Sequence, residues 1–288
     1  MTPPGYVTAE TSGGTWIVRS DVAGALPVEA LAALLRGAAG RSAVPGRGRG
    51  DVVRLDFAGR SGIGKRARHG GLLGRLLGGF YWGTGRALRP IDLALRLRRA
   101  GVPTPDVLAA GWRRVAGPLH AHALVTEAIP DAVNLQDALL GARPAARLQA
   151  LCRASADAVR SMHDARFVHA DLNLSNLVLE DAAGSPRAHV VDLDRGRFVS
   201  RLSDGDRLRN LSRLLRSHEK WVAGTAPLRP RDMLAFLERY CRGDRARVRA
   251  LVARLVRRRS RLWLRRVAWG RRRAKADSRS LARPAQQR

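Results

Sequence analysis

Cysteine is scarce in this sequence of 288 residues, and long apolar runs are missing. Cys152 and Cys241 are too few and too far apart for a disulfide framework or a zinc knuckle, so we expect two small buried residues and a reducing, cytoplasmic setting. No stretch approaches the roughly 18 uncharged apolar residues of a membrane span. The first residues lack the basic and apolar regions of a signal peptide, so we expect no secretion by a standard signal. A hydrophobic content of 45% excludes a disordered protein and predicts a globular one.

Acidic residues are also few beside the basic ones. The sequence has 24 Asp and Glu against 53 Lys and Arg, for a formal net charge of +29. Such a charge indicates an anionic partner, which could be nucleic acid, an anionic membrane surface or a phosphorylated substrate. Residues 245–276 alone carry 13 Arg, one Lys and no acidic residue, a net charge of +14. This stretch is therefore expected to behave as a separate electrostatic unit.

The hydrophobic pattern predicts a β-rich first half and a helical second half. Strands are expected within residues 13–19, 51–57, 60–68, 102–114 and 119–130, and helices within 27–39, 90–101, 134–141, 144–165 and 205–221. Pro90 suits the first turn of its helix and Gly101 suits the C-terminal cap. Residues 70–86 are expected to be a glycine-rich connection. The fold class is therefore α+β.

Three polar residues stand at intervals of two and five in the segment VHADLNLSNLVLE. His169, Asp171 and Asn176 precede a short apolar strand, and alone they fit a polar helix-to-strand connection. A second segment, HVVDLDRG, puts Asp192 after another apolar strand, 21 residues beyond Asp171. Phosphoryl transfer needs one carboxylate for the hydroxyl proton, and an amide and a second carboxylate to hold Mg²⁺ on the phosphates. We therefore interpret Asp171 as the base, Asn176 and Asp192 as metal ligands, and His169 as a support of the loop.

The other parts of a nucleotide site lie upstream. Only three lysines occur, and Lys65 lies on a predicted strand, where it could grip the phosphates of ATP. The segment GRGRG (Gly46, Gly48 and Gly50) would let backbone N–H groups approach phosphates, although alone it indicates only a flexible loop. On the kinase interpretation, Glu127 lies at the hinge, where the main chain would contact adenine. Its side chain could equally be a solvated charge.

At these motifs the chain resembles the 3-deoxy-D-manno-octulosonic acid (Kdo) kinases and related lipopolysaccharide core kinases. The resembling segments are GRGRGDVVRL, KRARHGGLLGRL, LRRAGVPTPDVLAAG, VTEAIPDAVNLQDAL, FVHADLNLSNLVL, VVDLDRGR and RNLSRLLRS. The resemblance implies a two-lobed protein-kinase-like fold, with a β-rich nucleotide-binding lobe at 1–129, a helical catalytic lobe at 130–244 and a basic helical tail at 245–288. It also implies ATP-dependent, Mg²⁺-assisted phosphorylation of the Kdo sugar of a lipid A precursor, at the cytoplasmic face of the inner membrane.

Two positions depart from the family pattern. The family has a Glu on the helix after the third strand, paired with the basic residue of that strand. Pro90 aligns there, and Asp92 is the nearest acid. Ala170 replaces the Arg of H-R-D, and no phosphorylation site follows Asp192, so we expect no regulation through that loop.

Several alternatives stay open. The chain could be another small-molecule or lipid-sugar kinase, of the heptose or aminoglycoside type, or a non-catalytic pseudokinase that binds membranes or nucleic acid. Nucleic acid is the less expected partner because no recognition module accompanies the charge. Asp194 is either a further metal or substrate contact or a turn former. The oligomeric state is not indicated.

The tail has two interpretations. Its apolar residues fall near one helical face: Val248, Leu251, Val252, Leu255, Leu262, Trp263 and Val267. The face could pack on the helical lobe, or it could lie in an anionic membrane surface through residues 245–276.

Overall fold

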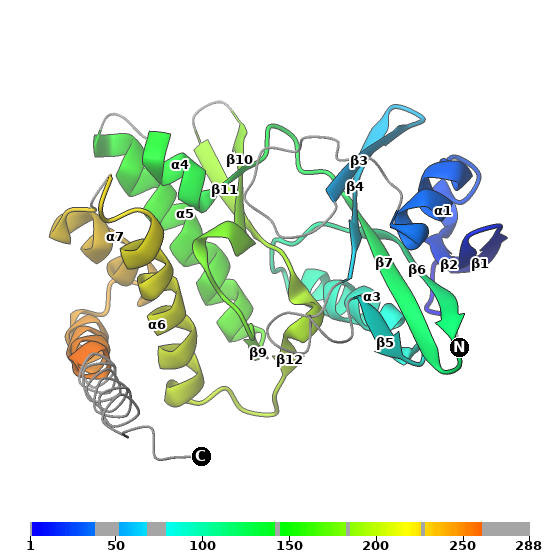
Figure 1. The fold of residues 1–288 in the computed structure, drawn as a ribbon. Coiled ribbons are helices and arrows are strands. Elements are labelled where there is room, and N and C mark those ends of the chain that lie inside the picture. Colours follow the sequence, from blue (N-terminus) through cyan, green and yellow to red (C-terminus); the bar gives the residue numbers. More distant parts are fainter. Residues whose placement is uncertain are drawn as a thin grey trace, which may run out of the picture.

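The computed structural model describes residues 2–37, 52–67, 79–141, 145–182, 185–225 and 228–260 (Figure 1). Its N-terminal half is built on one antiparallel sheet and its C-terminal half mainly on helices, as the hydrophobic pattern predicts. The glycines 46, 48 and 50 and the segment HGG at 69–71 lie outside the described residues.

Seven strands form the N-terminal sheet of the described chain. Their order is β1 (Tyr6–Thr11), β2 (Gly14–Arg19), β6 (Val107–Ala116), β7 (Leu119–Glu127), β4 (Arg60–Arg66) and β3 (Val52–Phe57), and β5 (Phe80–Trp82) pairs with β7. The short helix η1 (Ser20–Val22) follows β2. Side chains of a strand alternate between the two faces. Trp16 and Val18 join the apolar cluster that contains the leucines of α1 (Val28–Arg36), whereas Ile17 joins the cluster that contains α3 (Gly85–Arg99).

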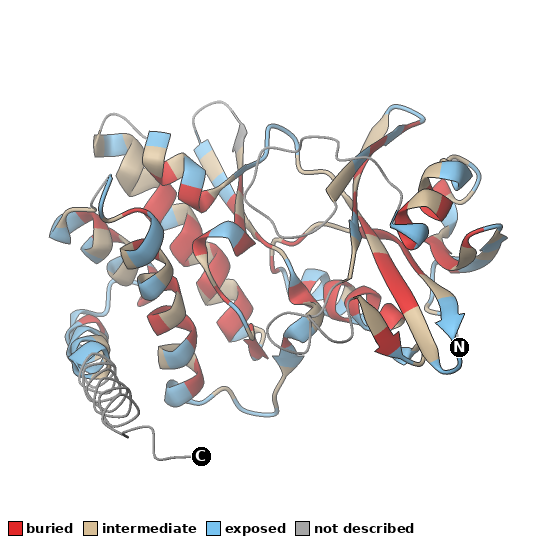
Figure 2. Ribbon diagram, in the orientation of Figure 1, coloured by how far each residue is buried: buried red, intermediate tan, exposed pale blue. Residues whose placement is uncertain are grey.

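The C-terminal half surrounds two small antiparallel sheets with helices. The helices are α4 (Leu135–Gly141), α5 (Ala145–Asp164), α6 (Asp204–Trp221) and α7 (Pro230–Tyr240). One sheet joins β8 (Val133–Asn134), β10 (Leu177–Ala182) and β11 (Ser185–Val190), and the other joins β9 (Phe167–Val168) and β12 (Arg197–Phe198). Two short 3₁₀ turns, η2 (Leu174–Asn176) and η3 (Leu193–Arg195), follow β9 and β11. Buried residues concentrate along α5 (Figure 2).

The larger apolar cluster spans both halves of the chain. It joins Ile17 and Ile91 from the N-terminal half to Leu151 and Met162 on α5. The predicted lobe boundaries at 129/130 and 244/245 stay predictions. The expectation for the cysteines is confirmed, since Cys152 and Cys241 are both free and buried, and burial raises the pKa of the Cys152 thiol to about 12.

Most predicted elements are confirmed, but the start of α3 is wrong. The helix begins at Gly85, so Pro90 lies inside it and is buried. A proline there lacks the N–H that would bond the carbonyl of Arg86, which costs helix stability. For this reason the sequence pattern placed Pro90 in the first turn of the helix. The elements not predicted from the sequence are the strands β1, β5, β8, β9 and β12, the helix α7 and the three 3₁₀ turns.

Residues 245–260 form a helix that packs against the C-terminal half beside α6 (Figure 1). Val248 is buried, and Leu251 and Leu255 pack against the large apolar cluster. The predicted face is partly wrong because Val252 is exposed. Ion pairs from Arg254 to Asp204 and from Arg259 to Glu219 tie the helix to α6. The packing interpretation therefore holds up to residue 260, while Leu262, Trp263 and Val267 lie outside the described residues.

Candidate active site

The loop at residues 169–176 is held by a buried histidine. His169 has only 1% of its surface exposed. Its Nδ1 accepts a hydrogen bond from the backbone N–H of Asp171 at 3.1 Å, and its Nε2 donates to the carbonyl of Val191 at 3.0 Å. Burial lowers the pKa of this imidazole, which agrees with a neutral ring that donates on one side and accepts on the other. His169 therefore fixes the loop in the supporting position predicted from the sequence.

Asn210 on α6 holds the same loop from below, and sequence reasoning missed it. Its amide Nδ2 donates to the carbonyl of His169 at 2.7 Å, and its Oδ1 accepts from the backbone N–H of His169 at 3.3 Å. The same Oδ1 accepts from Nε2 of His163 at 3.1 Å, and the other ring nitrogen lies 2.8 Å from the hydroxyl of Tyr240. Burial lowers the pKa of His163 to about 4, so this ring is also neutral. The segment RNLSRLLRS offered no local signal for this network.

Asn176 and Asp171 lie together in the loop. The side-chain amide of Asn176 donates to the backbone carbonyl of Asp171 at 2.8 Å, and Asn173 caps the turn by accepting from the N–H of Asn176 at 3.1 Å. Asn176 is buried, and its Oδ1 has no hydrogen bond to any residue that the structure describes. The carboxylate of Asp171 is exposed and, within the described ranges, makes no hydrogen bond or ion pair. Both oxygen groups are therefore available to a ligand.

The turn at residues 192–196 lies next to this loop. The backbone N–H of Val191 donates to the carbonyl of Asn176 at 3.1 Å, which places Asp192 directly beside the loop. Asp192 adopts a left-handed conformation, with φ of 62°. This conformation is uncommon for residues other than glycine, and Asp is among those that tolerate it. It turns the chain sharply after β11.

Lys65 reaches the turn from the sheet. Its Nζ lies 2.9 Å from Oδ1 of Asp192, although the two are separated by 127 positions in the sequence. Both side chains are partly exposed, so water weakens the pair. The structure thus brings the predicted phosphate-binding lysine and the predicted metal ligand into direct contact.

Helix α3 contacts the turn with arginines rather than with a glutamate. Arg89 donates to the carbonyl of Gly196 at 2.7 Å, and Arg86 lies 3.7 Å from the carboxylate of Asp194. The guanidinium of Arg86 also lies over the ring of Tyr81, 4.7 Å from its centroid. Burial and the nearby Asp192 charge raise the pKa of Asp194, and the neighbouring cations oppose that rise. In the family pattern the helix supplies a glutamate. Here the helix supplies the cations, and the turn supplies the acid.

Two acidic residues singled out in the sequence, Asp92 and Glu127, both form ion pairs with arginines. Asp92 pairs with Arg96 one turn along α3 at 3.7 Å, whereas Lys65 forms its ion pair with Asp192. Asp92, the nearest acid to the position of the missing glutamate, therefore forms no ion pair with Lys65 in the described structure. The carboxylate of Glu127 pairs with Arg60 at 2.7 Å, and its backbone N–H donates to Asp106. An adenine contact at Glu127 stays a prediction.

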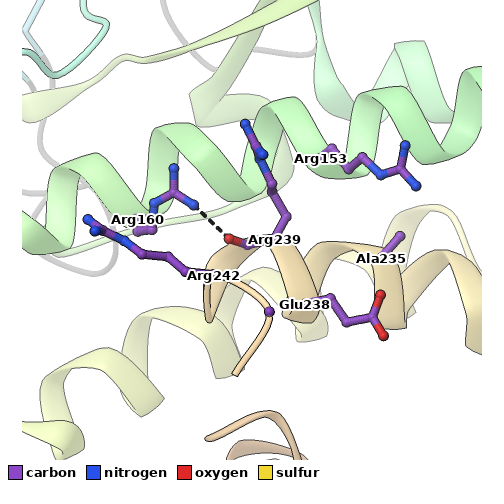
Figure 3. A pocket seen from close by; sticks show the side chains of 7 residues that line it. Arg153, Arg160, Ala235, Glu238, Arg239 and Arg242 are labelled. Atoms are coloured by element: carbon purple, nitrogen blue, oxygen red, sulfur yellow. Dashed lines mark hydrogen bonds between the residues drawn. The ribbon is translucent and has the colours of Figure 1, made fainter. Parts of the chain in front are cut away.

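The donor groups of the site are few. Within the described residues, no cluster of three or more His, Cys, Asp or Glu side chains is placed to hold a metal ion. One cavity of about 640 Å³ lies elsewhere, between α5 and α7, and Figure 3 shows Arg153, Arg160, Arg239 and Arg242 around it. That cavity is separate from the 169–176 loop and the 192–196 turn.

Comparison with known proteins identifies a family and several relatives. Residues 47–240 match the lipopolysaccharide kinase (Kdo/WaaP) family. The 3-deoxy-D-manno-octulosonic acid kinase of Vibrio cholerae serotype O1 is 32% identical over 179 residues, covering 61% of this chain and 72% of that protein. The enzyme of the same name from Haemophilus influenzae is 30% identical over 184 residues, covering 61% of this chain and 74% of the relative.

A solved structure supports the predicted fold class. The structure titled "WaaP in complex with acyl carrier protein" has a TM-score of 0.51 and 26% sequence identity to this chain. The match covers 76% of this chain and 87% of that one. The two-lobed kinase-like α+β fold is therefore confirmed, and the enzyme class follows from the relatives, which are phosphotransferases acting on a sugar. Because the family match spans most of the chain, this protein belongs to the lipopolysaccharide kinase (Kdo/WaaP) family.

Proposed function

We propose that this chain transfers a phosphoryl group from ATP to a hydroxyl of the Kdo sugar in a lipid A or lipopolysaccharide inner-core precursor. The observation that carries the proposal is that the segments H-x-D-L-N-x-x-N and D-x-D lie side by side, and that Asp192 of the second segment meets Lys65 across the two halves of the fold. The family and the names of the relatives support Kdo as the acceptor sugar. A kinase of the heptose or aminoglycoside type is the second candidate, because the family description covers more than one kinase.

In this proposal Asp171 is the catalytic base. Its carboxylate is exposed while the backbone around it is immobilised by His169 and Asn176, which suits a group that must meet an incoming hydroxyl in one geometry. Lys65 holds the phosphates of ATP. Its charge is balanced by Asp192 at 2.9 Å, so phosphate oxygens would compete for the same cation.

The residues present also fit Mg²⁺. The ion prefers oxygen ligands and usually takes one or two carboxylates, completing its shell with phosphate oxygens and water. Asn176 offers its Oδ1 and Asp192 its second carboxylate oxygen, so the small donor set suits an ion that arrives with the nucleotide. When bound, Mg²⁺ would neutralise charge on the transferring phosphates. Contacts of Gly46, Gly48 and Gly50 with phosphate and of Glu127 with adenine complete the proposal.

Two isosteric variants test these roles. Asp171→Asn should retain nucleotide and lower the transfer rate by about 10²–10⁴-fold, because a positioned base contributes that much. Asp192→Asn should instead weaken Mg²⁺-dependent ATP binding. Nucleotide affinity and single-turnover transfer to a panel of Kdo, heptose and aminoglycoside acceptors would be measured in parallel. A wild-type transfer rate in folded Asp171→Asn would remove Asp171 from the mechanism, and nucleotide binding without transfer to any acceptor would favour a pseudokinase.

We further propose that the enzyme works at the cytoplasmic face of the inner membrane, held there by its basic C-terminal segment. Among the described residues, no helix has the length and apolarity to span a bilayer. In the helix of residues 245–260, Val248, Leu251 and Leu255 pack against the protein itself, whereas most of the arginines are exposed. Each basic residue close to an anionic surface contributes on the order of 1 kcal/mol. Such a contact would bring the enzyme close to an acceptor that is carried by a membrane lipid.

Two truncations separate membrane binding from packing. A chain ending after Ser260 removes six Arg and one Lys of residues 261–276 and keeps the packed helix. It should stay folded and phosphorylate a soluble Kdo acceptor, yet lose activity on acceptor in anionic vesicles, with vesicle binding that falls steeply with salt. A chain ending at Gly243 should be destabilised, because Val248 and its neighbours leave the apolar cluster. Vesicle binding that ignores both salt and the loss of residues 261–288 would contradict the proposal.

A further inference from the structure

A second group of arginines lies at the junction of the two halves, where the C-terminal end of α3 meets β9 and β12. There a cavity of about 450 Å³ is lined by Arg96, Arg99, Ala100, Ala165, Arg166, Phe198 and Val199. Three of these seven residues are cations, and none is an acid. We refer to this cavity as the α3–β12 pocket.

The three cations have little neutralising contact. Arg99 is exposed and, among the residues that the structure describes, has no hydrogen bond or ion pair. Arg166 donates only to the carbonyl of Ser200 at 3.2 Å, which leaves its charge unbalanced. Arg96 has a long pair with Asp92 at 3.7 Å between two exposed side chains. Cations gathered in one cavity raise the local potential and attract an anion.

The floor of the pocket is apolar and orients one guanidinium. Arg96 lies over the ring of Phe198, with its Cζ 3.9 Å from the centroid. A guanidinium stacked on a ring keeps the N–H groups at its edge free for a planar or tetrahedral anion. Arg166 is turned toward the same cavity from the short connection between α5 and β9, where its φ of 59° is left-handed. This backbone conformation is costly for arginine, and tertiary contacts maintain it.

In the α5–α7 cavity (Figure 3), three of the four lining arginines are already paired with carboxylates. There Arg239 and Arg160 both bond to Asp157, and Arg242 bonds to Asp164 at 3.0 Å. Those guanidiniums already have carboxylate partners. In the α3–β12 pocket only Arg96 has one, so an incoming anion gains more from the second cluster than from the first.

We propose that the α3–β12 pocket is a second anion site, which binds the phosphate of a phosphomonoester. Arginine suits phosphate because its planar fork can donate two parallel hydrogen bonds, and three such forks can satisfy a dianion. The volume of about 450 Å³ is in the range of small-ligand sites, and the apolar floor accepts the carbon part of the ester. The ester can be free in solution or carried by a lipid. The proposal does not depend on the phosphoryl-transfer mechanism.

The pocket is connected to the candidate active site by edge-to-face contacts between aromatic rings. Phe198 contacts Phe167 at 5.1 Å between centroids, and Phe167 contacts His169 at 6.4 Å. Gly196 fits against Phe167 so closely that an added Cβ would lie 2.1 Å from Cζ of that ring. The floor of the pocket therefore packs against β9, the strand that leads into His169.

The test uses inorganic phosphate and phenyl phosphate as probes, titrated by calorimetry into the full chain in the presence of excess Mg²⁺ and a non-hydrolysable ATP analogue. Arg99→Gln should weaken both probes by about tenfold or more, because a charge-assisted bond is lost. It should not disturb the fold, since Arg99 has no described partner. The matched control is Arg187→Gln on β11, which removes an equally exposed charge and should leave both affinities unchanged.

Further measurements locate the site and its source of phosphate. Phenyl phosphate should slow hydrogen exchange at residues 166–168 and 197–199 in wild type and in Asp192→Asn, but not in Arg99→Gln. Vesicles containing phosphatidate, compared with vesicles of a phosphodiester lipid at equal charge, test the lipid source with the same variants. Binding that needs Arg99 in either form supports the site. Affinities equal in wild type and Arg99→Gln, or lowered equally by Arg187→Gln, would overturn it.

Discussion

The 169–176 loop and the 192–196 turn lie side by side but are held in different ways. Buried, neutral hydrogen bonds from His169 and Asn210 hold the loop, and all of them come from the C-terminal half. Partly exposed contacts with Lys65, Arg86 and Arg89 hold the turn, and all of them come from the N-terminal half. Buried hydrogen bonds resist salt and are costly to break, whereas exposed ion pairs are weak and screened. The loop is thus preorganised, and the geometry of the turn depends on how the two halves are placed.

The largest effect is expected at Asn210, because the loop rests on it. Asn210→Leu would leave the Nε2 of His163 buried without a partner and the carbonyl of His169 with only a long hydrogen bond from Arg213 at 3.5 Å. We expect a loss of about 3 kcal/mol or more in the free energy of unfolding, measured by urea denaturation. Ser212→Ala on the same helix is the control, because its hydroxyl bonds only the carbonyl of Leu208 within the helix. Equal losses in the two variants would mean that the network under the loop carries no special stability.

A pH effect of similar size is expected at His163. Burial lowers its pKa from 6.5 to about 4, so the unfolded chain binds a proton in this range and the folded chain does not. The stability from the neutral ring is therefore complete above pH 6.5 and is lost as the pH falls toward 4, by about 3 kcal/mol. His163→Gln should be less stable at pH 7 and should lose less stability between pH 6.5 and 4. If the free energy of unfolding fell by the same amount in wild type and variant between pH 6.5 and 4, the assignment would be contradicted.

Activity should show the next effect, at the contact between the turn and the sheet. Lys65→Ala should lower kcat/KM by about 10–100-fold, because the cation that holds the phosphates is lost, and Lys65→Arg should be milder. Asp92→Ala should leave kcat/KM unchanged, because Asp92 pairs with Arg96. A loss in Asp92→Ala as large as that in Lys65→Ala would restore Asp92 as the substitute for the missing glutamate.

The smallest effect is expected at the exposed pair of Arg86 and Asp194. Arg86→Gln should lower kcat/KM by an amount that corresponds to about 1 kcal/mol or less of transition-state stabilisation. The difference from wild type should shrink as salt is added. The charge exchange Arg86→Asp with Asp194→Arg should recover part of the loss of Arg86→Asp alone. A salt-independent effect, or no recovery in the double variant, would show that the pair does not position the turn.

The local parts of the site could be predicted from sequence spacing. His169, Asp171 and Asn176 lie within eight positions, so one loop brings them together, and Asp192 follows a strand that must pair with the strand after Asn176. Strand and helix periodicity also predicted β2, β3, β4, β6, β7 and the helices α1, α5 and α6, because each buries one apolar face.

Contacts between distant segments carry no such periodic signal. Arg86 and Arg89 extend α3 by a turn that Pro90 argues against, and their partners lie more than 100 positions away. Asn210 looks like an ordinary polar residue of an amphipathic helix until His169 and His163 are placed around it. Partner choice at Lys65 likewise depended on which carboxylate the folded chain brought nearest.

The order of the residues was therefore enough to indicate the enzyme class, because a carboxylate, an amide and a second carboxylate at these intervals suit phosphoryl transfer. Folding settled which groups support them. Ion pairs and buried hydrogen bonds act over a few ångströms in space, without regard to distance along the chain, so the pairing of Lys65 with Asp192 and the arginine-lined pocket beside Phe198 arise only when the two halves meet.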